Sequence, residues 1–349
     1  MNVSRETSTS SRPDPPTVSR ETLPHTTPWA ATGSTSSRST SPRSARASVT
    51  DRLPSPKPKR PRVVAVSNQK GGVGKTTTAV NIAAALAQDG LGVLLIDMDP
   101  QGNASTALSI THHEGDLGIY DVLIDERPLI RVVQECPDVR GLWCAPSTVD
   151  LAGAEIELVG LSHRERRLRQ VIEQLYAALD RSRRPTPDYV IIDCPPSLGL
   201  LTLNALVAAD EVLVPIQGEY YALEGLTSLM RTISLVQDSM NPKLTVGAIL
   251  LTMVDGRTNL AAQVAEEVRR HFPGQVLRST IPRSVRLSES PSYGQTVMTY
   301  DPTGTGALSY RSAAREFAHR GAGGSTPSSA ASDARTPPAS TTTEQGAAR

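Results

Sequence analysis

The amino-acid sequence predicts an α/β fold built on a doubly wound, mostly parallel sheet. Short runs of Val, Ile, Leu and Ala alternate along the chain with longer segments in which apolar residues recur at helical spacing. The runs are apolar almost throughout, which is typical of parallel strands that helices cover on both faces. Strands and helices that alternate in this order favour parallel strands joined by crossover helices.

Six strands and three helices are predicted in chain order. The strands cover residues 63–66, 93–96, 189–192, 212–216, 245–251 and 276–281. The helices cover residues 76–88, with Gly90 just beyond the end, 224–237 and 260–271. Ligands of doubly wound sheets bind at the carboxyl ends of the strands, so the residues that follow each strand are the candidate site.

Composition divides the 349 residues into three parts. Residues 1–62 are dominated by Ser, Thr, Pro and Arg, and residues 321–349 by Gly, Ser, Ala, Thr and Pro. Neither end has enough apolar surface to offset chain entropy, so both are predicted to be disordered tails. Residues 63–320 have the size of one α/β domain. The N-terminal tail is basic, with 11 Lys and Arg against 4 Asp and Glu, although the whole chain is nearly neutral.

Three cysteines, Cys136, Cys144 and Cys194, provide neither a CxxC pair nor an even disulfide framework. The N-terminus lacks the apolar segment of a signal peptide, and no apolar run is long enough to span a bilayer. We therefore expect a cytoplasmic protein without direct membrane insertion.

A glycine-rich loop follows the first predicted strand and precedes the first predicted helix. Gly71, Gly72 and Gly74 allow the backbone to wrap closely around anionic oxygens, and the helix N-terminus adds free N–H groups. Lys75 places a cation near the β and γ phosphates of a nucleotide, and the Thr76 hydroxyl is a ligand for Mg²⁺. Strand, loop and helix together predict a phosphate-binding P-loop.

Carboxylates follow the next strands at the same sheet edge. Asp97 and Asp99 stand after the second predicted strand, and Asp193 stands after the third. A P-loop ATPase needs one acid near Mg²⁺ and one group that orients the attacking water. The sequence therefore predicts a Mg²⁺ and ATP site at this edge.

The loop departs from the standard GxxxxGK[ST] motif, because Gln69 stands where that motif has its first glycine. Residues 70–76, KGGVGKT, instead resemble the deviant Walker A motif, KGGxGK[ST], of the ParA/MinD family of P-loop ATPases. Residues 154–158, 201–205, 219–225, 252–258 and 281–287 resemble segments of chromosomal ParA/Soj ATPases in the expected order. The resemblance covers essentially residues 63–320.

The resemblance implies an ATP hydrolase in which two subunits enclose ATP, with Lys70 reaching the partner subunit's nucleotide. Asp193 matches the Walker B acid, Asp99 the residue that positions water, and Asp97 a supporting contact near the metal. Adenine contacts map to Thr252, Met253, Pro282 and Ser284, where the family more often has Asn in place of Ser284. The implied catalytic residues are Lys70, Lys75 and Asp99. The implied metal ligands are Thr76, Asp97 and Asp193. The implied nucleotide-binding residues are Lys70, Gly71, Gly72, Val73, Gly74, Lys75, Thr76, Thr77, Thr252, Met253, Pro282 and Ser284.

The resemblance also implies non-specific DNA binding through Arg257, Arg283 and Arg286. Arginine suits phosphate because its fork donates two hydrogen bonds and stays charged. An aromatic content of 3% leaves little stacking surface, so we expect binding to depend on backbone charge and on salt. The implied partners are a second subunit on ATP binding, nucleoid DNA and a ParB-type centromere-binding protein that stimulates hydrolysis.

Other members of the superfamily remain alternatives. A MinD-like positioning ATPase anchors to membrane by a C-terminal amphipathic helix, and residues 321–349 lack an apolar face for one. An iron-protein-like reductase needs two cysteines per subunit in a cluster context that Cys136, Cys144 and Cys194 do not provide. A tyrosine autokinase would carry tyrosines after Tyr310, and none follows. A scaffold that binds nucleotide without turnover stays open, because motifs do not exclude it.

Overall fold

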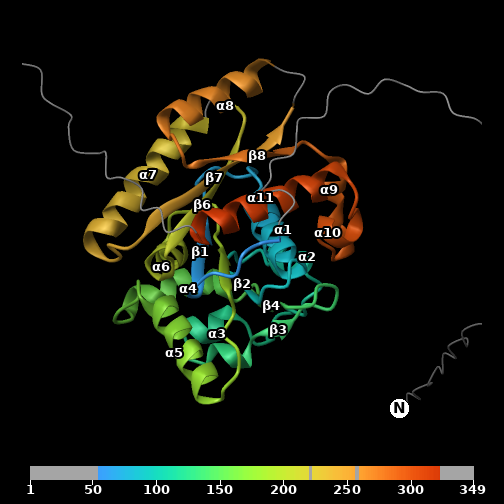
Figure 1. The fold of residues 1–349 in the computed structure, drawn as a ribbon. Coiled ribbons are helices and arrows are strands. Elements are labelled where there is room, and N and C mark those ends of the chain that lie inside the picture. The colour runs from blue at the N-terminus through green and yellow to red at the C-terminus, as the bar shows by residue number, and fades with distance from the viewer. Residues whose placement is uncertain (1–53, 220–221, 256–258, 323–349) are drawn as a thin grey trace, which may run out of the picture. The chain divides into compact units, whose positions relative to one another are not determined.

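The computed structural model describes residues 54–219, 222–255 and 259–322. Its centre is an eight-stranded sheet with the order β3-β4-β2-β5-β1-β6-β7-β8, in which every neighbouring pair is parallel except β3 and β4 (Figure 1). The strands are β1 (Arg62–Val66), β2 (Val93–Asp97), β3 (Gln134–Glu135), β4 (Leu142–Ala145), β5 (Tyr189–Asp193), β6 (Glu211–Gln217), β7 (Thr245–Val254) and β8 (Val276–Pro282). The α/β fold class predicted from the sequence is confirmed.

The strand order places a topological switch beside β1. The chain runs from β1 to β2 and β4 on one side, returns to insert β5 between β2 and β1, and then extends the sheet on the other side through β6, β7 and β8. The parallel register sets the last residues of three strands in one row, Val66 beside Asp193 and Asp193 beside Asp97. Ligands bind at such a switch, outside the carboxyl ends of the strands.

Helices cover both faces of the sheet. The α-helices are α1 (Lys75–Gln88), α2 (Asn103–Ala107), α3 (Ile119–Leu123), α4 (Leu151–Glu157), α5 (Arg167–Arg181), α6 (Leu200–Ala208), α7 (Ala222–Ser239), α8 (Asn259–His271), α9 (Val285–Glu289), α10 (Val297–Tyr300) and α11 (Thr305–Ala322), and the short 3₁₀ helices are η2 (Leu129–Arg131), η3 (Leu158–Gly160) and η4 (Ser290–Tyr293). Within the described ranges, no helix is both long and apolar enough to cross a bilayer.

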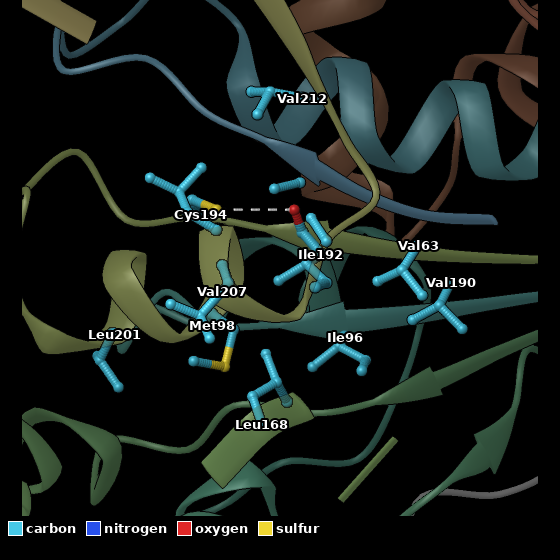
Figure 2. Packing of buried hydrophobic residues seen from close by; sticks show 14 of the residues in the cluster. Val63, Ile96, Met98, Leu168, Val190, Ile192, Cys194, Leu201, Val207 and Val212 are labelled. Atoms are coloured by element: carbon cyan, nitrogen blue, oxygen red, sulfur yellow. Dashed lines mark hydrogen bonds between the residues drawn. The ribbon is translucent and has the colours of Figure 1, made fainter. Parts of the chain in front are cut away.

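Alternate residues of β1 pack into two separate cores, as the pleat of a strand requires. Val63 and Ala65 face the core formed with helices α3 to α8, whereas Val64 and Val66 face the core formed with α1, α2 and α11. Figure 2 shows part of the first core, where strand residues such as Ile96 lie against helix residues such as Leu168. Both faces of β1 are therefore buried, and only its ends reach polar surroundings.

All six predicted strands and all three predicted helices are present, each within three residues of its expected ends. The edge strands β3 and β4 were not predicted, because β3 has only two residues and β4, with the sequence LWCA, lacks the run of Val and Ile that marks the predicted strands. Helices α5 and α11 were also not predicted. Helix α5 carries Leu168, Ile172, Leu175 and Leu179 at helical spacing, so the sequence did hold a signal for it.

The folded part begins upstream of the predicted boundary at residue 63. Ser55 is 6% exposed, and its N–H and Oγ–H donate to Asp89 Oδ2 at 2.9 and 2.8 Å. Arg315 donates to the same carboxylate from α11, at 3.1 and 3.0 Å. Burial alone would raise the pKa of Asp89, but these hydrogen bonds lower it below its usual value. Of the two predicted tails, only residues 54–62 and 321–322 are among the described residues.

Candidate nucleotide site

The loop between β1 and α1 has the backbone conformation that its glycines predict. Gly72 and Gly74 have φ angles of 74° and 84°, in the left-handed region that favours glycine. A Cβ added at Gly71 or Gly72 would meet no atom within 4 Å, so the space beside this turn is open. The loop therefore presents bare backbone to a ligand.

Helix α1 begins directly after this loop. Its N-cap is Gly74, which provides no side-chain hydrogen bond, and the first backbone bond of the helix runs from Thr78 N–H to the Gly74 carbonyl at 2.9 Å. The N–H groups of Lys75, Thr76 and Thr77 precede that bond and have no intrahelical acceptor. Free N–H groups at a helix N-terminus form a ready anion site.

Lys75 lies at the floor of the loop and is only 7% exposed. Its Nζ donates to the Lys70 carbonyl oxygen at 3.1 Å, so the side chain folds back under the loop. Burial lowers the pKa of Lys75, and the nearby Asp193, Cys194 and Asp99 oppose that shift. The structure thus brings Lys75 together with two of the predicted carboxylates.

Asp193 is fully buried at the end of β5, and neither carboxylate oxygen has a hydrogen-bond partner among the described residues. Burial raises its pKa well above the usual value, and the neighbouring Asp97 raises it further, whereas the Thr76 hydroxyl and Lys75 lower it. Removing a charge from water without partners carries a large free-energy cost. An orphaned carboxylate beside a hydroxyl and a lysine fits a site that is completed by a cation such as Mg²⁺.

Asp97 lies next to Asp193 in the sheet but is hydrogen-bonded. Its Oδ2 accepts from the N–H and hydroxyl of Ser105 at 2.8 and 2.7 Å, and its Oδ1 accepts from the Asp99 N–H at 3.2 Å. Burial raises the pKa of Asp97 to about 6 despite these bonds. Asp97 therefore anchors the start of α2.

Asp99 stands two residues further on and is 8% exposed. Its Oδ1 accepts from the Gln101 N–H at 3.0 Å, which fixes a tight turn before α2. Gly102 follows with a φ of 62°, and a Cβ there would stand 2.9 Å from the His112 ring. The turn is tightly packed, so Asp99 is held at the edge of the site.

Lys70 lies on the outer side of the loop and is engaged by a residue that the motif analysis did not single out. Its Nζ pairs with Glu219 Oε2 at 2.7 Å, and the two side chains are 36% and 48% exposed. The Lys70 N–H donates to Asn68 Oδ1 at 3.0 Å, and Asn68 Nδ2 donates to the Pro215 carbonyl at 2.8 Å. Glu219 comes two residues after the end of β6, at the carboxyl edge of the sheet. Its place directly after a predicted strand is the feature of the sequence that could have identified it.

The predicted base-contacting residues lie on the far side of the loop. Thr252 is buried, and its hydroxyl donates to the Val73 carbonyl at 2.8 Å, so it holds the loop in place. Met253 has a φ of 51°, and its Cε would lie 3.8 Å from a Cβ at Gly74. Pro282 ends β8, and Ser284 is the half-buried N-cap of α9 without a side-chain cap bond.

Two of the predicted DNA-contacting arginines are exposed near this edge. Arg283 and Arg286 flank the start of α9, and the Arg283 N–H donates to the Val254 carbonyl at 3.3 Å. Arg257 lies outside the described residues.

A separate cavity of about 1010 Å³ opens at the amino ends of β2, β4 and β5, lined by residues such as Leu94, Trp143 and Leu179. That cavity is at the opposite edge of the sheet from the loop.

Comparisons with known proteins agree with this geometry. A family model described as "AAA domain" matches residues 61–246. The sporulation initiation inhibitor protein Soj of Bacillus subtilis is 49% identical over 260 residues, which are 74% of this chain and 99% of Soj. The chromosome partitioning protein ParA of Myxococcus xanthus is 51% identical over 259 residues, 74% of this chain and 88% of its own. A similar solved structure is the crystal structure of cobyrinic acid a,c-diamide synthase from Mycobacterium smegmatis with bound ATP analog and magnesium. Its sequence is 37% identical and its TM-score is 0.62, and the match covers 72% of this chain and 92% of that chain.

Proposed function

Because the chain belongs to the Soj/ParA family of chromosome-partitioning ATPases, we propose that it is a DNA-partitioning ATPase that dimerises around ATP, binds DNA non-specifically and is released by partner-stimulated hydrolysis. The observation that carries the proposal is the meeting of Lys75, the glycine loop and the unpartnered Asp193 carboxylate at one sheet edge. This arrangement supports a Mg²⁺ and ATP site.

The phosphates of ATP lie in the loop of residues 70–76, where the free N–H groups of α1 and the Lys75 ammonium bind their oxygens. Thr76, Asp193 and Asp97 would hold Mg²⁺, and Asp193 would supply the oxygens that lack partners. Bound Mg²⁺ neutralises charge on the β and γ phosphates. The Thr252 bond to Val73 keeps the loop closed while the nucleotide binds.

Hydrolysis needs one water aligned with the γ-phosphorus. Asp99 accepts a hydrogen bond from that water, and its turn, fixed by the Gln101 N–H, sets the direction of attack. The water oxygen bonds to phosphorus while the bond to the β–γ bridging oxygen breaks, which gives ADP and phosphate. Lys75 binds the charge that develops on the phosphate oxygens.

Dimerisation brings Lys70 to the partner subunit's nucleotide. In the single chain this ammonium is paired with Glu219, so the pair opens before Lys70 reaches across. An exposed ion pair of this kind is weak, and the γ-phosphate is a stronger anionic partner for a lysine. ATP with its γ-phosphate therefore favours the dimer, whereas ADP does not.

The dimer binds DNA through arginines on the surface that includes Arg283 and Arg286, together with Arg257. A ParB-type centromere-binding protein stimulates hydrolysis and thereby releases the DNA. The protein then acts in the cytoplasm on the nucleoid, with a folded domain over residues 54–322 between two tails. The relative from Myxococcus xanthus is named a chromosome partitioning protein, which favours this function over a MinD-like positioning role.

Co-sedimentation with DNA tests the proposal. The full chain is incubated with duplex DNA and ATP, ADP or no nucleotide, each with and without the candidate centromere protein. We expect DNA binding with ATP alone and its loss when the centromere protein is added. Asp99→Ala should stay on DNA in the presence of that protein. Equal binding under all three nucleotide conditions would contradict the proposed cycle.

A further inference from the structure

An exposed tyrosine and one of the proposed DNA-contacting arginines both contact Tyr300. Tyr293 ends η4 and is 66% exposed. Its ring stacks on Tyr300 of α10, with ring centroids 5.1 Å apart and an angle of 23° between the planes. The low aromatic content of the chain led us to expect little stacking surface, but two of its eight tyrosines are concentrated at this point.

Tyr300 also holds Arg286. The Arg286 guanidinium lies 5.6 Å from the centre of the Tyr300 ring, and its Nη1–H donates to the Tyr300 hydroxyl oxygen at 3.3 Å. The Tyr300 O–H donates to Glu289 Oε2 at 3.3 Å, and Arg286 reaches the same oxygen at 3.5 Å. Arg286 is therefore oriented by three contacts while its side chain stays 60% exposed.

The turn that carries Tyr293 is anchored to the rest of the protein. The Ser109 hydroxyl donates to the carbonyl of Gly294 at 2.7 Å. Gly294 has a φ of 65°, and a Cβ at this position would stand 2.3 Å from Ser109 Oγ. Ser109 comes shortly after α2, the helix that follows Asp97 and Asp99. The backbone under the exposed ring is thus fixed to the same segment as the candidate catalytic turn.

We propose that Arg286 and Tyr293 form one DNA-contacting face, in which Arg286 binds a backbone phosphate and the Tyr293 ring covers the adjacent deoxyribose of duplex DNA. Tyr300 is a positioning residue that orients the guanidinium and supports the second ring. The inference rests on the proposed DNA binding and adds to it a contact that is not electrostatic. In a duplex the base faces are stacked inside, so sugars and phosphates are what such a face meets.

Salt separates the two kinds of contact. Each phosphate contact releases counterions from the DNA. Loss of one such contact therefore reduces the steepness of the plot of log association constant against log salt concentration by about 1. A ring packed on a sugar releases none. Loss of Tyr293 therefore lowers affinity equally at every salt concentration, whereas loss of Arg286 lowers both affinity and slope.

The experiment measures binding of the full chain to a labelled duplex of mixed sequence by fluorescence anisotropy, with Mg²⁺ and a non-hydrolysable ATP analogue, across a salt titration. We expect Tyr293→Ala to bind roughly tenfold more weakly with an unchanged slope, in the range of one aromatic contact to nucleic acid. Arg286→Ala should lose affinity and about one unit of slope. Tyr300→Phe keeps the ring but not the hydroxyl, so its slope should fall between wild type and Arg286→Ala.

Controls separate this face from folding and from the proposed function. Leu235→Ala removes another exposed apolar side chain, 67% exposed on α7, and should bind as wild type. All variants should keep the circular dichroism spectrum and the ATP-dependent dimer of wild type. Wild-type affinity in Tyr293→Ala together with a defect in Arg286→Ala overturns the shared face and leaves the DNA function standing. If the wild-type chain binds no duplex, both the shared face and the proposed DNA binding are overturned. If the wild-type chain binds single strands more tightly than duplex, and Tyr293→Ala loses that preference, the deoxyribose contact is overturned.

Discussion

Strand β1 begins and ends at two buried charged clusters that differ in how their charges are satisfied. At its start, the Arg62 guanidinium donates to both carboxylate oxygens of Glu211 at 2.7 and 2.9 Å and to the Tyr189 hydroxyl at 2.7 Å, and it lies 4.5 Å from the centre of the Phe317 ring. Beside the other end, Asp193 of β5 is fully buried but has no hydrogen-bond partner among the described residues. The partnered cluster holds the fold together, and the unpartnered one is complete only with a ligand.

The largest expected effect lies at the partnered cluster. Arg62→Ala leaves Glu211 buried without its cation and removes the contacts to Tyr189 and Phe317. Breaking a buried ion pair in this way costs about 3–5 kcal/mol of unfolding free energy. Chemical denaturation measures the change. Lys57→Ala removes an ion pair to Asp188 whose lysine is 75% exposed, and it serves as the control that stays within about 1 kcal/mol of wild type. Equal stability of Arg62→Ala and wild type would show that the two ends of β1 do not differ as described.

The second prediction concerns the pH dependence of stability, which has opposite signs at Asp97, next to Asp193, and at Asp89, which is paired with Ser55 and Arg315. Asp97 has its pKa raised to about 6 by burial, so its contribution to stability is greatest below the unfolded pKa and falls as pH rises toward 6, by about 3 kcal/mol. Asp89 has its pKa lowered by Arg315 and Ser55, so its contribution is present above the unfolded pKa and is lost as pH falls.

Denaturation of the nucleotide-free protein between pH 2 and pH 7 tests these signs, because this range covers the unfolded pKa of both carboxyl groups and the comparison with each variant isolates one of them. The difference in unfolding free energy between Asp97→Asn and wild type should shift in favour of the variant as pH rises. For Asp89→Asn the shift should favour wild type. Shifts of the same sign in both variants would refute the contrast.

The smallest expected effect is at the exposed rim. Glu219→Gln removes the charge that holds Lys70 in the single chain, while both side chains stay substantially exposed. Stability should change little, since exposed ion pairs contribute weakly. Dimerisation with a non-hydrolysable ATP analogue should occur at a nucleotide concentration a few times lower than in wild type, measured by light scattering. Arg169→Gln, which breaks an exposed pair with Glu173 on α5, should leave that concentration unchanged. A higher concentration requirement in Glu219→Gln would mean that Glu219 supports the dimer.

The sequence was sufficient to place the parts of the site that follow strands directly. Asp97 and Asp193 are the last residues of their strands, and Gly72 and Gly74 lie in the loop between β1 and α1, so the parallel sheet brings all four to one edge. Cys136, Cys144 and Cys194 are free and buried in the structure.

Other features depend on distances that no local pattern contains. The pairing of Lys70 with Glu219 joins residues 149 positions apart. The stack of Tyr293 on Tyr300 joins η4 to α10, and the Ser109 hydroxyl holds the turn after η4 through the Gly294 carbonyl. Helix α11 buries mostly small residues, such as Ala307 and Ala314, so its apolar face is weak in the sequence.

The central claim is that the unpartnered Asp193 marks the Mg²⁺ and ATP site. Calorimetric titration with a non-hydrolysable ATP analogue, with and without Mg²⁺, measures this directly in wild type and Asp193→Asn. We predict that Mg²⁺ strengthens binding by at least about tenfold in wild type and has no effect in Asp193→Asn, which should be as stable as wild type or more stable. An equal gain from Mg²⁺ in both proteins would contradict the claim.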